Sequence, residues 1–472
     1  MKNSIKHFSL FFLGNIIPQI ANFLLLPLYA NDMGSSEYGI LQTVTVLQSI
    51  LTISMSLAVE RSIFRIYLDY PPEEKSSFLG SVYLFSILNG FVLMVLVSVL
   101  GYFFSNTLFP GISFYPTIFL VIASSYFFTT GLSVKNYFIM EKRASLFFIL
   151  TICQFSLETS LRIVLIKVFH LGANGQLSAN ALIGIIFAPA FFYYAVKNFK
   201  LVWKSQYLKS ALKFSIPFIP SLLAAFVMNY FDRLFLQRYF LPQEVGVYAV
   251  GQKIASMVPL VVISLQQSYS PDFFRKYVAI TKRNENLQKR SSLILMMVGL
   301  VSFVIALFSK ELISVFFKPE YTSAGMVIPI LVLGYFYNGL ASLAGLSINA
   351  EKKNWIVTII LLFSMGVNFI LNAILVPAFG MLGASFATTG SFITYGVLVW
   401  IVTKWNKWPS VSMLSFVGLS FVIIMVIVLS YFTANASFYL IIAIKVLICL
   451  FILSVLIVKR HEILSFIKPK SD

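Results

Sequence analysis

Apolar runs of about twenty residues recur along almost the whole chain, and they constrain its fold more than any other feature. A helix needs ~20 such residues to cross a bilayer, and lipid offers backbone groups no partner, so each run must be helical. Of the 472 residues, 59% are hydrophobic, which is more apolar surface than a soluble domain can bury. We therefore predict an all-α, polytopic membrane protein of about 14 transmembrane helices. The predicted spans lie near residues 8–30, 39–58, 79–104, 115–138, 145–167, 177–196, 214–236, 246–268, 292–309, 326–349, 355–376, 383–403, 413–433 and 438–458.

Basic residues gather on one side of the predicted membrane. With the N-terminus placed inside, 27 of the 35 Lys and Arg fall in inside segments, among them Lys135, whereas the outside loops clearly hold Arg238, Lys310 and Lys318. Positive charge is enriched in cytoplasmic loops, so this bias predicts cytoplasmic N- and C-termini. The formal net charge of +18 is spread over many short inside loops, which argues against nucleic acid as a partner.

Short motifs recur at a nearly constant spacing, which indicates two similar halves. Six spans separate the two copies of each motif, so both copies have the same orientation, a parallel repeat of the kind found in transporters. We expect a six-helix bundle over residues 1–200, its repeat over 201–409, and two additional helices with a short cytoplasmic tail over 410–472. The motifs, 207 to 210 residues apart, are E-x-G at Glu37 and Glu244, F-R-x-Y at Phe64 and Phe274, an EK turn at Glu141 and Glu351, and G-x-x-G at Gly172 and Gly380.

Together these features resemble the Wzx-type polysaccharide flippases (O-antigen or capsule type) of the multidrug/oligosaccharidyl-lipid/polysaccharide exporter superfamily. The resemblance rests on the six-span halves, the E-x-G and EK motifs, and the G-x-x-G-A sequence from Gly380 to Ala384. It implies two bundles around a central cavity. It also implies transfer of an undecaprenyl-diphosphate-linked oligosaccharide to the outer leaflet of the bacterial inner membrane, with membrane lipids, a polysaccharide polymerase and a chain-length regulator as partners. About fourteen spans also fit the lipid II flippase branch, and Arg143, Lys353 and Gln176 depart from the motifs, so the subfamily stays open.

Ionisable residues inside the spans give an independent argument, because they are expensive in a bilayer and tend to be functional. Cations at this depth should face a wet cavity or pair with an anion, and a diphosphate meets that need. We predict that the substrate is bound by the basic residues Arg162, Lys167, Arg233, Lys253 and Lys445, with Gln19 and Asn22 of the first span. The alternative is that Glu158 and Arg162 form only an intrahelical pair and that Arg233 and Lys167 extend toward the interfaces. For Gln19 and Asn22 the alternative is interhelical hydrogen bonding.

Two further roles follow from position. Glu158 and Asp232 are the acids within the spans, and we predict that they couple transport to an ion; charge balancing of neighbouring arginines is the alternative. Arg65 and Arg275 occupy matching F-R-x-Y positions and are predicted to form a cytoplasmic gate. Contact with lipid phosphates is the alternative there.

Two other classes of function are weighed against a flippase. A multidrug antiporter of the same fold would need acidic cavities for cationic substrates, and the basic excess within the spans opposes this. An enzyme acting on the same glycolipid would need clustered catalytic residues, and no nucleophile–base arrangement is visible, so we predict no catalytic activity. The three histidines do not cluster, and Cys153 and Cys449 lie far apart, so neither a metal nor another cofactor is expected.

Overall fold

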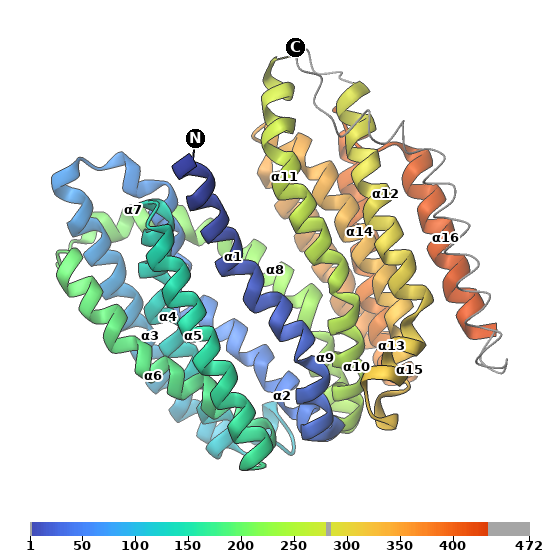
Figure 1. Cartoon of the computed structure of the whole chain (residues 1–472), viewed down its shortest axis with the longest axis horizontal. Coiled ribbons are helices and arrows are strands. Elements are labelled where there is room, and N and C mark those ends of the chain that lie inside the picture. The colour runs from blue at the N-terminus through green and yellow to red at the C-terminus, as the bar shows by residue number, and fades with distance from the viewer. Residues whose placement is uncertain (1, 280–284, 433–472) are drawn as a thin grey trace. The chain divides into compact units, whose positions relative to one another are not determined.

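The structure, a computed structural model, describes residues 2–279 and 285–432 (Figure 1). Helices make up almost all of this part of the chain, and it contains no strand, so the all-α prediction is confirmed. The chain divides into two compact units, Met1–Ala249 (unit 1) and Val250–Asp472 (unit 2). The predicted division at residue 200 rests on sequence repetition rather than on packing, and it stays a prediction.

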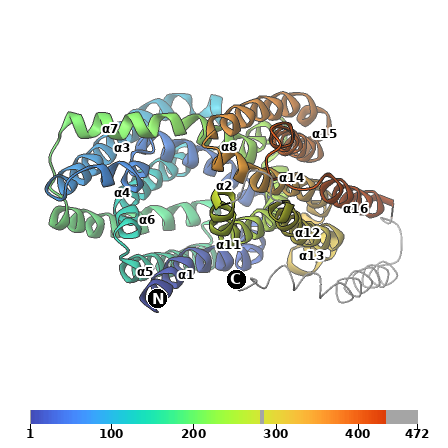
Figure 2. The same cartoon turned by 90° about the horizontal axis from the view of Figure 1, so that it is seen from above.

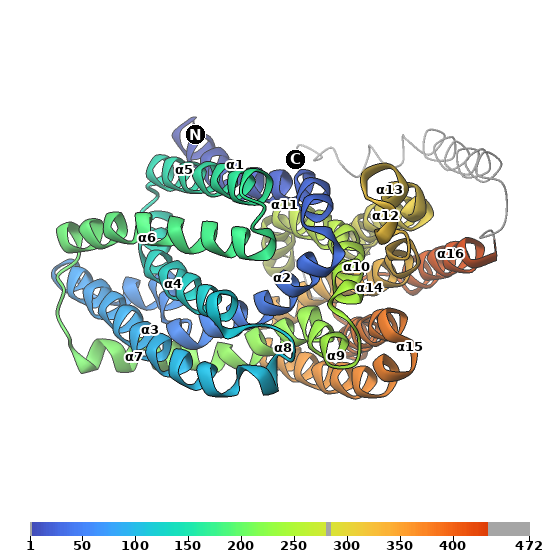
Figure 3. The same ribbon diagram turned by 90° about the horizontal axis from the view of Figure 1, so that it is seen from below.

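Unit 1 contains the first nine α-helices and most of the tenth. Their bounds are α1 (Lys2–Leu24), α2 (Leu26–Ser56), α3 (Pro72–Leu108), α4 (Phe119–Met140), α5 (Ala144–Ile163), α6 (Gly172–Asn198), α7 (Ser205–Ser215), α8 (Ile219–Tyr230), α9 (Asp232–Tyr239) and α10 (Pro242–Ala255). Short 3₁₀ segments are η1 (Val59–Phe64), η2 (Ile66–Asp69) and η5 (Ile216–Phe218), and single π turns are η3 (Phe114–Ile118) and η4 (Val164–Val168). Figures 2 and 3 show α1 and α5 side by side, with α6 next to α5.

Unit 2 contains the end of α10 and the remaining helices. These are α11 (Met257–Ala279), α12 (Glu285–Leu307), α13 (Ser309–Phe316), η6 (Pro319–Tyr321), α14 (Ala324–Ala350), α15 (Asn354–Trp405) and α16 (Met413–Phe432). Helix α14 is buried along most of its length and packs chiefly against α15, so it forms the centre of this unit.

The helices agree with the predicted membrane spans. Ten helical stretches in the described residues are long and apolar enough to cross a membrane, and two shorter apolar helices lie at Ser9–Leu24 and Met413–Val428. Helix α15 holds two predicted spans, because its helical hydrogen bonding continues across a kink at Gly380. The chain is therefore a multi-pass membrane protein. The span predicted at 438–458 lies outside the described residues, so the total of fourteen stays a prediction.

The sequence repeat reappears as repeated backbone geometry. Helices α4 and α14 end in the two EK turns, where Lys142 and Lys352 adopt left-handed conformations with φ of 55° and 58°. In both turns the residue that follows donates its N–H to a carbonyl five residues back, Arg143 to Phe138 and Lys353 to Ile348, which closes the helix end. The first glycines of the two G-x-x-G motifs also share a positive φ.

The segment between the halves differs from the prediction. The sequence predicts no element between the spans 177–196 and 214–236, but Ser205–Ser215 form the amphipathic helix α7. Tyr207, Leu208 and Ala211 are buried against η1, η2 and the start of α3, and the Tyr207 hydroxyl donates to Glu74 at 2.8 Å. Apolar residues at helical spacing supply this face, and unit 1 supplies the surface that it covers.

Candidate functional site

A row of polar side chains runs along one face of α5. Gln154, Glu158 and Arg162 are each four residues apart, so they lie above one another on the helix. Arg162 is only 7% exposed, whereas the side chain of Glu158 is 26% exposed. The row is therefore a polar strip inside the membrane-spanning part of unit 1.

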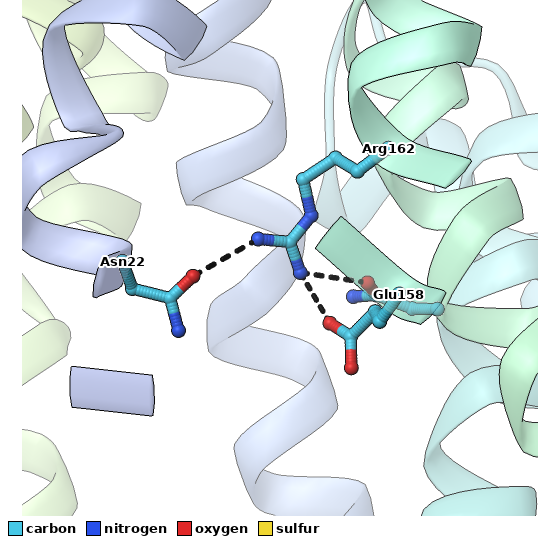
Figure 4. A network of polar contacts seen from close by, with 4 residues as sticks. Asn22, Glu158 and Arg162 are labelled. Atoms are coloured by element: carbon cyan, nitrogen blue, oxygen red, sulfur yellow. Dashed lines mark hydrogen bonds and ion pairs between the residues drawn. The ribbon is translucent and has the colours of Figure 1, made fainter. Parts of the chain in front are cut away.

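Arg162 lies at the centre of a network that joins three helices (Figure 4). One terminal nitrogen donates to Asn22 Oδ1 on α1 at 3.2 Å. The other donates to the Glu158 carboxylate and to Asn180 Oδ1 on α6, the latter at 3.3 Å. The guanidinium also lies over the ring of Tyr29 on α2, with Cζ 5.3 Å from the ring centroid. These contacts fix the guanidinium plane at one place in the bundle.

Some polar atoms around Arg162 are not satisfied. Within the described part of the chain, Arg162 Nε, the Tyr29 hydroxyl and Thr159 Oγ1 are buried and have no hydrogen-bond partner. Leaving a buried donor unpaired costs about 1–3 kcal/mol. A polar ligand group or a water molecule beside Arg162 would remove that cost, so the site has unused capacity for hydrogen bonding.

Three of the predicted site residues thus meet in one place, namely Asn22, Glu158 and Arg162. Gln19, one turn earlier on α1, has an exposed side chain. Asn180 was not among the predicted residues. Its role becomes visible only because α6 packs against α5.

Lys135 also differs from the prediction. The charge count assigns Lys135 to the inside segments, although the predicted span 115–138 contains it. In the structure it lies within α4, and its Nζ donates to Gln154 Oε1 on α5 at 2.8 Å. The ammonium also faces the buried ring of Phe191 on α6, 5.7 Å from the ring centroid. Helix α4 continues to Met140, so the inside loop begins after Lys135.

Lys167 lies farther along the chain, toward the predicted outer face. Its Nζ is 3.7 Å from a carboxylate oxygen of Asp32, and both side chains are partly exposed. Beside them, Glu37 of the first E-x-G motif accepts a hydrogen bond of 3.0 Å from the backbone N–H of Ala173, at the start of α6. An acid at a helix N-terminus is favourable, so Glu37 caps α6.

Asp232 and Arg233 form a second buried cluster. They are 1% and 3% exposed and begin α9, directly after α8. Arg233 donates to Gln42 Oε1 on α2 at 2.8 Å, and the hydroxyl of Tyr248 on α10 donates to Asp232. These bonds attach α9 to both α2 and α10.

The two E-x-G motifs meet close to that cluster. A Cβ at Gly39 would overlap the carbonyl oxygen of Pro242, and a Cβ at Gly246 would overlap that of Ser35. Each glycine also lies against the backbone nitrogen of the other. Helices α2 and α10 therefore cross backbone to backbone, on the side predicted to face outward, and only glycine fits at either position.

The remaining predicted residues lie on other elements or in the other unit. Arg65 in unit 1 is exposed and pairs with Asp69 on the next turn. Lys253 and Arg275 in unit 2 have exposed side chains. Lys445 lies outside the described residues.

Comparison with known families identifies the chain. A family model described as polysaccharide biosynthesis protein matches residues 4–276, which is more than half of the chain. The chain belongs to this family. The predicted membership of a polysaccharide family is thereby confirmed.

Individual relatives of this polysaccharide biosynthesis protein are distant. It is 22% identical over 275 residues to Lsg locus putative protein 1 of Haemophilus influenzae, an alignment that covers 56% of this chain and 64% of that protein. It is 24% identical over 196 residues to a probable low-salt glycan biosynthesis flippase of Haloferax volcanii, covering 40% and 41% of the two chains. The chain thus spans less than two thirds of the length of both relatives.

Among solved structures, the fold is similar to that of the lipid II flippase MurJ in an inward closed conformation. The TM-score is 0.74 at 17% sequence identity, and the match covers 96% of this chain and 100% of that one. At this identity the similarity concerns the fold alone. The polysaccharide biosynthesis protein thus has a fold similar to that of this flippase, with a polar network inside unit 1.

Proposed function

We propose that this protein is a flippase that moves an undecaprenyl-diphosphate-linked oligosaccharide from the inner to the outer leaflet of the bacterial cytoplasmic membrane, for synthesis of a surface polysaccharide. Its family and its lipid II flippase-like fold support a flippase of this superfamily. In this proposal both termini are cytoplasmic, the partners are the glycolipid and membrane lipids, and a polymerase and a chain-length regulator act on the product.

The observation that carries the proposal is the Arg162 network. A guanidinium presents a rigid fork of donors that suits phosphate oxygens, and here it is held in place by Asn22, Asn180 and Glu158. Its unpaired Nε and the unpaired hydroxyl of Tyr29 offer two more donors. A diphosphate has enough oxygens to engage these donors, whereas a hydrophobic cation has none.

The charges of the predicted site residues bear on the alternative of a multidrug antiporter. Within the predicted spans that the structure describes, the predicted basic site residues Arg162, Lys167, Arg233 and Lys253 outnumber the acidic residues Glu158 and Asp232. A cavity with this balance attracts anions and repels cationic drugs. Lipid II is itself a diphosphate-linked glycolipid, so the same chemistry would serve a lipid II flippase.

Transport in this proposal proceeds by alternating access between two repeats, 1–200 and 201–409, with 410–472 as an addition. The crossing of Gly39 and Gly246 closes the outer side, and it must separate when the protein opens outward. Arg65 and Arg275 form the inner gate. Glu158 and Asp232 couple the cycle to an ion, and Lys167, Arg233, Lys253, Lys445 and Gln19 contact the substrate along its path.

Removing single charges tests the proposal. Arg162→Ala and Lys253→Ala should abolish surface polysaccharide in a strain that depends on this protein, while the protein remains in the membrane. Arg162→Lys should restore part of the activity, since the charge survives although the bidentate fork is lost. Normal polysaccharide in both alanine variants would contradict the proposed role.

A further inference from the structure

Lys135 extends the polar row of α5 by a further positive charge. Gln154, which accepts its hydrogen bond, lies ten residues into α5, about 15 Å along the helix. That is near the middle of a hydrocarbon core of about 30 Å. The ammonium of Lys135 is therefore held deep in the membrane-spanning part of unit 1, rather than at a loop.

The ammonium is under-satisfied where it lies. A lysine ammonium has three donors, and in the described part of the chain its hydrogen bond goes to the neutral amide of Gln154. It makes no ion pair there. Glu158 is instead in direct contact with Arg162, which it neutralises.

The charges of the row do not balance. Lys135 and Arg162 lie on either side of Glu158, so two cations face one carboxylate. Tyr29, Asn22, Asn180 and Gln154 add donors and acceptors but no charge. A net positive charge at this depth is costly unless an anion joins it.

We propose that Lys135 is a second anion-binding residue, which contacts the diphosphate of the lipid-linked substrate about two helical turns closer to the predicted inner face than Arg162 does. This inference rests on the proposed function. Lysine acts as a mobile point charge toward phosphate, whereas arginine gives a fixed fork. Lys135 thus receives the diphosphate as it comes from the inner side, and Arg162 holds it in a defined orientation.

Binding of inorganic pyrophosphate to the purified full chain tests this inference directly. Lys135→Gln should weaken the affinity by on the order of tenfold to a hundredfold, the range for one lost hydrogen bond to a charged group. Lys135→Arg should remain within a few-fold of the wild type. The matched control is Lys197→Gln, which removes an exposed lysine at the end of α6 and should change nothing.

A purely structural role for Lys135 predicts a different pattern. In that case Lys135→Gln would lower the thermal midpoint without changing the pyrophosphate affinity, and that outcome overturns the inference. Lys135→Met, which keeps the length of the side chain, serves if the glutamine variant does not accumulate. A wild-type chain that binds no pyrophosphate also overturns it.

Export in cells separates this inference from the proposed function. Unchanged pyrophosphate affinity and normal polysaccharide in Lys135→Gln, with polysaccharide lost in Arg162→Ala, refute the inference alone. Weakened pyrophosphate binding in Lys135→Gln, with normal polysaccharide in every variant, supports the anion site and refutes the flippase.

Discussion

The hydroxyl of Tyr67 donates a 2.7 Å hydrogen bond to the carboxylate of Glu141, and the same bond recurs 210 residues later between Tyr277 and Glu351, at 2.6 Å. Both tyrosines end an F-R-x-Y motif, and both glutamates begin an EK turn. In each unit, two motifs that recur in the sequence therefore contact each other. The Tyr67 bond attaches η2 to the C-terminal end of α4, and the Tyr277 bond attaches the last turn of α11 to the C-terminal end of α14.

Removing these hydroxyls should destabilise each unit separately. Tyr67→Phe and Tyr277→Phe should each cost about 1–2 kcal/mol, because each leaves a carboxylate without its donor. The double variant should show nearly the sum, since each bond lies within its own unit. Thermal unfolding in detergent measures this, with Tyr193→Phe, an exposed tyrosine, as the control. A double variant as stable as the wild type would show that the bonds contribute nothing.

The same tyrosines predict a dependence on high pH. Burial, together with the hydrogen bond to glutamate, raises the pKa of both Tyr67 and Tyr277 above the usual value of about 10. Their contribution is therefore complete below pH ~10 and is lost as the pH rises above that value, where an unfolded tyrosine ionises but the folded one does not. The thermal midpoint should fall less steeply above pH 10 in the double phenylalanine variant than in the wild type.

The crossing of α2 and α10 should tolerate no side chain. Gly39→Val or Gly246→Val would drive a side chain into a backbone carbonyl, so either should disrupt the closed crossing and reduce export severely. Gly366→Ala, where a Cβ meets nothing within 4 Å, is the matched control. Surface polysaccharide and membrane level are measured together. Export at wild-type level in both valine variants would exclude a functional crossing.

An ion-coupling role and a structural role for Glu158 and Asp232 predict different effects of replacing these residues. If either couples transport to an ion, Glu158→Gln or Asp232→Asn should abolish the dependence of export on pH or on the ion gradient. If Asp232 only anchors Tyr248 and the α8–α9 junction, its asparagine variant should lose stability and keep the gradient dependence. Export assays at varied pH and sodium concentration distinguish the two.

The inner gate predicts a distance that changes during transport. Cysteines at positions 65 and 275 should be joined by a short crosslinker in one state of the cycle, and replacing both arginines by glutamine should reduce export. The ion pair of Arg65 with Asp69 supplies a control, because Asp69→Asn removes the pair and keeps the arginine. The absence of a crosslink under every condition, or intact export in the double glutamine variant, would contradict the predicted gate.

The sequence by itself determined the fold class and, over the described residues, the positions of the membrane-spanning helices. Lipid offers no partner to backbone groups, so each apolar run had to become a helix, and its length had to match the bilayer. The motifs also marked positions with special backbone geometry, such as Lys142 and Lys352. These properties depend on neighbours along the chain, so the amino-acid sequence alone specifies them.

Only the tertiary structure decided which polar groups meet. Glu158 and Arg162 could be paired from their spacing, but Asn180 and Tyr29 join them because α6 packs beside α5 and α2 packs against η4, which follows α5. Lys135 is partly buried, and its partner Gln154 belongs to another helix, so their contact could not be predicted from spacing either. Arg233 is bonded to Gln42, far away in sequence. Such contacts depend on how helices rotate and cross, and hydrophobic periodicity does not specify that.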